Sequence, residues 1–240
     1  MLVDSTPSSR VHSSEWIGGY HDTVGSDQEI SKSRRAENAE QTRLAILAAA
    51  RDLFTRRGYF QTKVGDIAIE ARVSVAWVHA VGGGKSGLLR TLIENGVTTE
   101  DNAVMLERMT SITEPAELVR FLVQATRLRF AEWADLMRQV AAAAPQDVSV
   151  RQSQDIAHEG LRGALRLTAH RLADMGALKE KLDPDRATDL LWLYLSNTAY
   201  FLRTDELGWS LDESETWLIE ILTQSLLAPR AQAGAPASNF

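Results

Sequence analysis

The stretch that decides the fold is "TKVGDIAIEARVSVAWVHAV", residues 62–81. Thr62 can cap a short helix whose first turn carries Asp66, where the helix dipole favours an acidic side chain. "RVS" at 72–74 then interrupts the helical pattern, and Ser74 can cap a second short helix. Two short helices joined by so tight a turn are typical of a helix-turn-helix, whose second helix lies in the major groove of DNA. The same pattern also fits two packed helices of an ordinary bundle, and the local residues leave both interpretations open.

The residues before this stretch predict an amphipathic helix from Thr42 to Arg57. Its apolar residues fall on one face, and Gly58 supplies the stop signal. Most of the chain up to residue 228 keeps helical spacing, and no run of alternating apolar residues indicates a strand. The sequence therefore predicts an all-α fold.

Charge is unevenly distributed along the chain. The net charge is −4 over residues 1–31, +6 over residues 32–90 and −8 over residues 91–240. A cationic segment joined to an anionic remainder suggests that only the cationic part approaches a polyanion. A solvated charged surface without a partner would give the same pattern.

Residues 1–31 and 229–240 lack a sustained hydrophobic period, so we expect a disordered N-terminal extension and a disordered tail. The chain has no cysteine, which excludes disulfides, thiolate catalysis and cysteine-ligated metals. The N-terminus does not look like a secretory signal, and the longest aliphatic and aromatic run, residues 190–195, is too short to cross a bilayer. We expect a cytoplasmic, nucleoid-associated protein without a membrane partner.

A glycine-rich loop, "GGGKS" at residues 82–86, resembles the phosphate loop of nucleotide-binding enzymes. The last four places of that motif are filled by Gly83, Gly84, Lys85 and Ser86, but His79 occupies the place of its first glycine. A phosphate loop also needs a buried strand before it, and the sequence predicts a helix there. A nucleotide-binding enzyme stays open as an alternative function.

The segment "TRLAILAAARDLFTRRGYFQTKVGDIAIEARVSVAWVHAVGGGKSGLLRTLIE", residues 42–94, resembles the DNA-binding domain of TetR-family transcriptional regulators. More weakly, "DELGWSLDESETWLIEIL" at 205–222 is similar to the last-helix segment of many actinobacterial members. The resemblance implies a three-helix DNA-binding domain at residues 32–84 and a larger helical domain for effector binding and dimerisation at residues 85–228. Two departures stand out: Arg72 occupies the place of the usual turn glycine, and the aromatic cluster of the recognition helix is reduced to Trp77 and His79.

By this resemblance the chain binds a near-palindromic double-stranded DNA operator as a homodimer, as a ligand-released repressor. Lys85 opens the fourth helix and meets a backbone phosphate. A basic arm ahead of the first helix reaches the adjacent minor groove, while Trp77 and His79 approach base edges or thymine methyl groups. The expected DNA-binding residues are Lys32, Arg34, Arg35, Thr62, Lys63, Ser74, Val75, Ala76, Trp77, His79 and Lys85.

For the larger domain we expect a small, bulky and largely apolar effector molecule with one polar handle. Its expected contacts are Met105, Met109, Phe121, Trp133, Met137 and His170. The expected dimer interface contains Leu191, Tyr194, Leu195, Thr198, Trp217, Ile221 and Gln224. A DNA-binding dimer without an effector site is the second alternative, and a filled C-terminal core would favour it. We expect no catalytic residues, no metal and no cofactor; "DPDRATD" at 183–189 is better explained by Asp183 capping a helix that begins at Pro184 than by a calcium loop.

Overall fold

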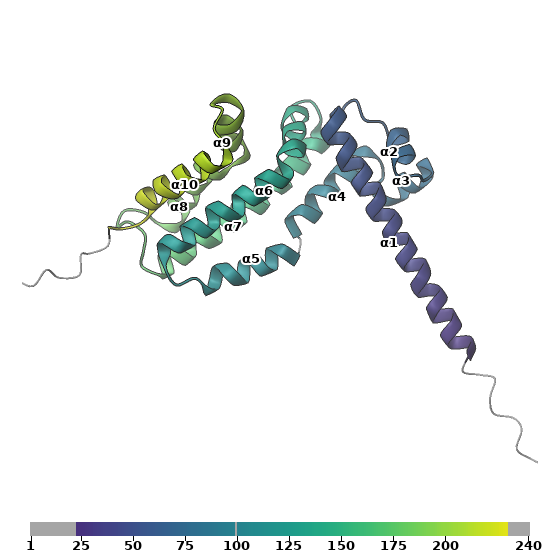
Figure 1. The fold of residues 1–240 in the computed structure, drawn as a ribbon, viewed down its shortest axis with the longest axis horizontal. Helices are drawn as coiled ribbons and strands as arrows, with labels where there is room; N and C mark the ends of the chain where they lie inside the picture. The colour runs from purple at the N-terminus through teal and green to yellow at the C-terminus, as the bar shows by residue number, and fades with distance from the viewer. Residues whose placement is uncertain (1–22, 99, 230–240) are drawn as a thin grey trace, which may run out of the picture. The chain divides into compact units, whose positions relative to one another are not determined.

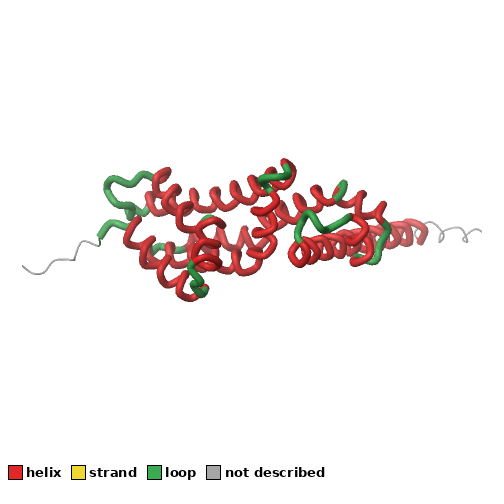
Figure 2. The backbone as a smooth tube through the Cα atoms, turned by 90° about the horizontal axis from the view of Figure 1, so that it is seen from above, coloured by secondary structure: helices red, strands yellow, loops and turns green. Residues whose placement is uncertain are grey.

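The computed structural model describes residues 23–98 and 100–229, and every regular element in these ranges is helical (Figures 1 and 2). A single isolated β-bridge joins Leu178 and Leu227. The all-α expectation is therefore confirmed. The helices are α1 (Thr23–Arg57), α2 (Val64–Glu70), α3 (Val75–Gly82), α4 (Lys85–Thr98), α5 (Glu100–Ser111), α6 (Pro115–Ala143), α7 (Val148–Asp174), α8 (Pro184–Leu195), α9 (Asn197–Phe201), the π-helical turn η1 (Leu202–Glu206) and α10 (Leu211–Leu226).

Helix α1 begins earlier than the sequence pattern predicted. Residues 23–31 belong to it, so the expected disordered extension does not reach residue 31; its first 22 residues, like residues 230–240 of the expected tail, lie outside the described residues. Apolar spacing could not reveal this part of α1 because it has no apolar stripe. Further along α1, an ion pair one turn apart joins Arg43 and Glu40 at 2.8 Å. The described residues up to Leu44 and those from Ala45 onward form two separate units, and the apolar cores and the cavity found among the described residues belong to the second.

The helix-turn-helix has the predicted position but partly different caps. Ser74 caps α3 by accepting a hydrogen bond from the Trp77 amide at 3.3 Å, as predicted. Thr62 does not cap α2; Lys63 is the N-cap residue. The hydroxyl of Thr62 instead lies buried below the surface and donates to the Gly58 carbonyl at 2.9 Å. Thr62 therefore ties the end of α1 to the start of α2.

Two large apolar cores organise residues 45–229. The first core contains side chains of α1, α2, α3 and α4, of the C-terminal half of α6 and of the start of α7. Leu53, Leu89, Leu136 and Val150 are among them. The second joins α5, α6, α7, α8 and α10, and Figure 1 shows α6 and α7 running side by side as its long central pair. Since α4 packs into the first core, the predicted domain boundary at residues 84/85 is not a break in packing.

The π-helical turn η1 is tied to α6 by a bidentate ion pair. Arg138 Nε and Nη2 lie 2.7 and 2.8 Å from the two carboxylate oxygens of Asp205. The hydrogen bonds from Arg138, and a further one from the Thr204 hydroxyl, lower the pKa of Asp205 to about 2. Because this folded-state pKa lies below that of the unfolded chain, the pair stabilises the fold above pH 4 and loses this contribution as the pH falls toward 2.

We predict that Asp205→Asn lowers the free energy of unfolding at pH 7 by about 1 kcal/mol, a value reduced for solvent screening because the Asp205 side chain is 40% exposed. About half of this loss should remain at pH 3. Thermal or urea unfolding at the two pH values measures it. Asp135→Asn is the matched control, since Asp135 contacts the same arginine but is 76% exposed, and its effect should be small. An equal loss for Asp205→Asn at both pH values would contradict the assignment.

Candidate functional site

Helix α3 presents most of its side chains to solvent. Val78 alone is completely buried, in the first core. Val75 and Trp77 are 47% and 49% exposed, and Ala76, His79 and Ala80 are exposed as well. Trp77 is thus a surface residue and not part of the small domain's core. A helix held by one face, with the remainder of its surface open, is suited to lie in a DNA groove.

The turn before α3 has the unusual backbone that its sequence suggested. Arg72 has φ of +57°, the one described non-glycine residue with a positive value. The left-handed conformation costs a non-glycine residue about 1 kcal/mol. The arginine side chain is exposed beside α3, as is that of Lys63 at the start of α2. One exposed cation therefore precedes each of the two helices of the motif.

Lys85 opens α4 as expected, but its ammonium group is already engaged. Nζ donates to the Tyr59 carbonyl at 2.9 Å and lies 4.2 Å from the centre of the Tyr59 ring. Burial lowers the pKa of Lys85 below its ordinary value. The lysine thus fastens α4 to the end of α1. An ammonium has three donors, so two remain for a phosphate.

The glycines of residues 82–87 have backbone roles that involve no nucleotide. Gly83 ends α3 in the left-handed conformation, with φ of +66°, and its amide donates to the His79 carbonyl at 2.7 Å. Gly87 lies so close to the end of α3 that a Cβ there would be 1.6 Å from the Gly82 carbonyl oxygen. A helix, not a strand, precedes the loop. The glycines let α4 turn tightly away from α3.

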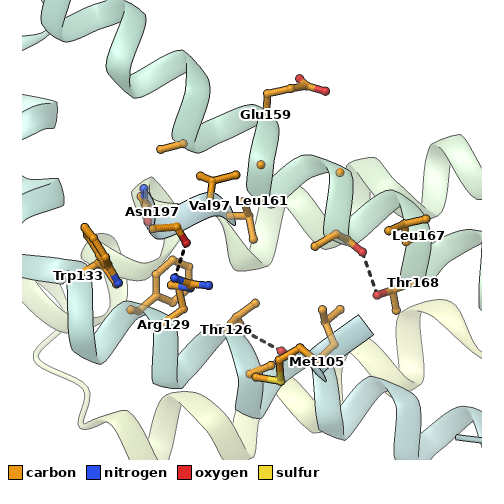
Figure 3. A pocket seen from close by; sticks show the side chains of 18 of the residues that line it. Val97, Met105, Thr126, Arg129, Trp133, Glu159, Leu161, Leu167, Thr168 and Asn197 are labelled. Atoms are coloured by element: carbon orange, nitrogen blue, oxygen red, sulfur yellow. Dashed lines mark hydrogen bonds between the residues drawn. The ribbon is translucent and has the colours of Figure 1, made fainter. Parts of the chain in front are cut away.

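A cavity of about 490 Å³ lies among α4, α5, α6 and α7 (Figure 3). Its walls are mostly apolar. Five of the six residues expected to contact an effector line it: Met105, Met109, Phe121, Trp133 and Met137. The sixth, His170, is exposed and does not line the cavity, because α7 turns it away from the wall formed by Leu161, Ala164 and Thr168.

The few polar groups of the cavity gather at particular places. Figure 3 shows Arg129 and Trp133 at one end and Thr168 at the other. Arg129 Nη1 donates to the Gly96 carbonyl at 2.6 Å, which links α6 to α4. Trp133 Nε1 is buried and has no hydrogen-bond partner among the described residues. Arg129 was not among the residues predicted from the sequence, because one arginine on a long helix carries no distinguishing signal.

The expected interface residues divide between surface and core. Leu191 and Leu195 are completely buried within the subunit and cannot contact a partner chain, which corrects that prediction. Their spacing of four residues places them on the inward face of α8. Tyr194, Thr198, Trp217, Ile221 and Gln224 have part or most of their surface exposed. Leu193, 65% exposed on the outer face of α8, is an apolar surface residue that the sequence pattern did not indicate.

The basic arm that was expected ahead of the first helix is part of α1. Arg34 and Arg35 are exposed within α1 and not ahead of it, and the side chain of Lys32 lies outside the described residues. Within the described ranges, no cluster of His, Asp and Glu is arranged to hold a metal ion. No helix there is both long and apolar enough to cross a membrane.

Residues 46–92 match the family model described as bacterial regulatory proteins, tetR family. The matched range covers the C-terminal third of α1, the helix-turn-helix and the first turns of α4. These residues therefore form a TetR-family DNA-binding domain. Members of this family are transcriptional regulators and not enzymes. No curated protein sequence matches the chain.

Solved structures share the fold of this chain along most of their length. FadR from Bacillus subtilis, solved with stearoyl-CoA, is 18% identical with a TM-score of 0.64, over 75% of this chain and 97% of that one. The fatty acid degradation regulator FadR from Bacillus halodurans is 17% identical with a TM-score of 0.62, over 75% and 94%. NalD, the secondary repressor of the MexAB-OprM multidrug efflux pump in Pseudomonas aeruginosa, is 22% identical with a TM-score of 0.59, over 80% and 98%. At these identities the likeness shows the fold alone.

We predict that Lys85→Ala lowers affinity for operator and random DNA by similar factors, because a phosphate carries no base information. The dependence of log affinity on log salt should fall by about one unit of slope. Gel-shift titrations at several salt concentrations measure this, with thermal melting to follow the lost bond to Tyr59. Lys181→Ala, an exposed lysine outside the helix-turn-helix, is the control. If Lys85→Ala abolished ATP binding and left DNA binding unchanged, Lys85 would be a nucleotide ligand and its assignment to a DNA phosphate would be wrong.

Trp77→Ala and His79→Ala should behave differently from Lys85→Ala. Each should cost about 1–3 kcal/mol on the operator and much less on random DNA, since both side chains are exposed on the helix that we expect to face base edges. The same titrations on the two DNAs give the ratio. Equal losses on both would mean that these side chains do not read bases.

Proposed function

We propose that this TetR-family protein is a ligand-released repressor that binds a near-palindromic operator as a homodimer. The observation that carries the proposal is the exposed α3, supported on one face by the first core, within the residues that match the family model. The protein then works in the cytoplasm, associated with the nucleoid. The positive net charge of residues 32–90 also supports DNA contact by this part of the chain.

Dimerisation follows from how such a helix reads DNA. One eight-residue helix reaches too few base pairs for a selective site, whereas two copies about 34 Å apart read two successive major grooves on one face. The exposed apolar surface of α8 around Leu193, together with Tyr194 and Trp217, is the proposed contact. Each of these residues would meet the partner through the same patch, as two-fold symmetry requires.

The cavity supports an effector over the alternative of a dimer without one. Its volume lies in the range of small-molecule sites, and its apolar walls with a few polar groups are typical of them. A filled core would have favoured the other alternative. An effector that binds better to one spacing of the two recognition helices would shift the population toward that spacing and release the operator.

A nucleotide-binding enzyme is the weaker proposal. The loop at residues 82–87 follows a helix, and its glycines are accounted for by the turn into α4. The cavity also lies away from this loop, lined by no residue before Ile93. We therefore propose that the protein is not an enzyme and needs no cofactor.

Footprinting on the DNA that flanks the protein's own gene tests the function directly. We expect protection of two half-sites separated by one helical turn, with a mass in solution that corresponds to two chains or more. Absence of any protected site there, and of any sequence enriched from a random duplex pool, would overturn the proposal.

Filling the cavity should separate effector response from DNA binding. Gly163 lines the cavity within α7, and a Cβ there meets no atom within 4 Å. We predict that Gly163→Leu keeps the fold and the operator affinity, because a helical glycine is replaced by a better helix former. An effector candidate, such as a long-chain acyl compound, should protect this variant against thermal unfolding only at a concentration at least ten times higher than the unmodified protein needs.

Ala141→Leu, which adds the same side chain on an exposed part of α6 outside the cavity, is the control and should respond like the unmodified protein. Equal thermal shifts for Gly163→Leu and the control, with a compound that does bind, would place the effector elsewhere.

A further inference from the structure

The outward face of α3 is centred on two alanines. With 100° between successive residues, Val78, Val81 and Gly82 form the side turned toward the protein, in keeping with their lower exposure. Ala76 and Ala80 lie opposite, at the middle of the open face. Val75 and His79 flank them on one side.

Trp77 flanks the alanines on the other side and is 49% exposed. The part of α3 that can approach base edges most closely thus carries methyl groups.

Helix α3 also lacks the side chains that read guanine or adenine by paired hydrogen bonds. Its sequence, "VAWVHAVG", contains no Arg, Lys, Asn or Gln, which supply those bidentate contacts, and no Asp or Glu, which read cytosine. Trp77 offers one donor, and His79 offers a single contact at a time. The His79 ring leans toward the loop after α3, where a Cβ on Gly84 would lie 3.7 Å from its Cε1.

We propose that this protein recognises thymines of its operator by their 5-methyl groups, which Val75, Ala76 and Ala80 contact in the major groove. This inference rests on the proposed function and names the base feature that the site recognises. Alanine and other apolar side chains contact the thymine methyl group, the one apolar feature of the major-groove edges. Small residues at the centre of the face let the helix backbone come close enough for these contacts.

The exposed cations near α3 are suited to phosphates and not to bases. Arg72 and Lys63 are exposed before α3 and α2, where cations hold phosphates and carry no sequence information. The sequence preference read in the major groove is then assigned to α3. The half-sites should hold thymines at the positions under Val75, Ala76 and Ala80, on either strand.

Replacement of thymine by uracil tests the proposal, since it removes one methyl group and leaves every hydrogen-bonding group in place. The probe is a duplex enriched from a random pool by the full-length protein, remade with deoxyuridine at one thymine at a time. Fluorescence anisotropy gives its affinity. Loss of a buried methyl group should weaken binding about fourfold at each contacted position. Uracil in the flanking DNA should have no effect.

A matched pair of protein variants assigns the contact. In Val75→Ala, one thymine position should lose its sensitivity to uracil, because the side chain that met the methyl group has been shortened. Ile69→Ala makes a similar truncation at a residue of α2 that is 79% exposed, and every uracil penalty should stay as in the unmodified protein.

The outcomes separate the two proposals. Equal affinity for thymine and uracil duplexes at every position would overturn methyl reading while leaving the DNA-binding function intact. Methyl reading would also be overturned if Val75→Ala and Ile69→Ala changed the uracil penalties alike. Failure to enrich any duplex over random DNA would overturn the proposed function together with this inference.

Discussion

The packing of α4 connects the two functional regions of residues 45–229, the core that supports α3 and the cavity. Its first half, with Leu88, Leu89 and Leu92, is buried in the core that supports α3. Its second half, with Ile93, Gly96 and Val97, lines the cavity. A helix is stiff over this length, so a displacement at its cavity end is carried to its other end. That other end begins at Lys85, which is fastened to the end of α1.

Contacts of α6 give the cavity a second route to the DNA-binding helices. Arg129 bonds to the Gly96 carbonyl at the end of α4, and Arg51 of α1 lies 4.3 Å from the centre of the Trp133 ring. Arg51 also donates to the Glu132 carbonyl at 2.7 Å. The Trp133 indole therefore lies between the cavity and Arg51 of α1. A molecule that moved Trp133 would act on α1 and α4 together, and packed interfaces of this kind tend to have discrete arrangements.

The sequence predicted the helix caps that depend on neighbouring residues. It did not predict which side chains of a helix are buried. Ser74 as the cap of α3 and Asp183 as the cap of α8 follow from backbone hydrogen bonding within four residues, and both are confirmed. Thr62 obeys the same local rule but is drawn into the core by the end of α1, a neighbour that the local pattern does not include. Leu191 and Leu195 are apolar on a helix with apolar residues all round, so the inward face could not be chosen from the pattern. The cavity residues were placed more successfully, because methionine and aromatic side chains at helical spacing had to face the interior.

The alanine-centred face of α3 sets how such a protein can be selective at all. Methyl contacts are individually weak, each worth about a factor of four, so one half-site discriminates poorly between related sequences. A symmetric dimer adds the free energies of two half-sites, which squares the discrimination ratio. The same arithmetic makes release efficient, because an effector that takes only one recognition helix out of register removes half of the sequence-specific free energy and leaves the phosphate contacts as a non-specific remainder. In the proposed dimer, a recognition helix with few polar groups ties specificity to the distance between two copies, and we propose that a ligand in the cavity changes this distance.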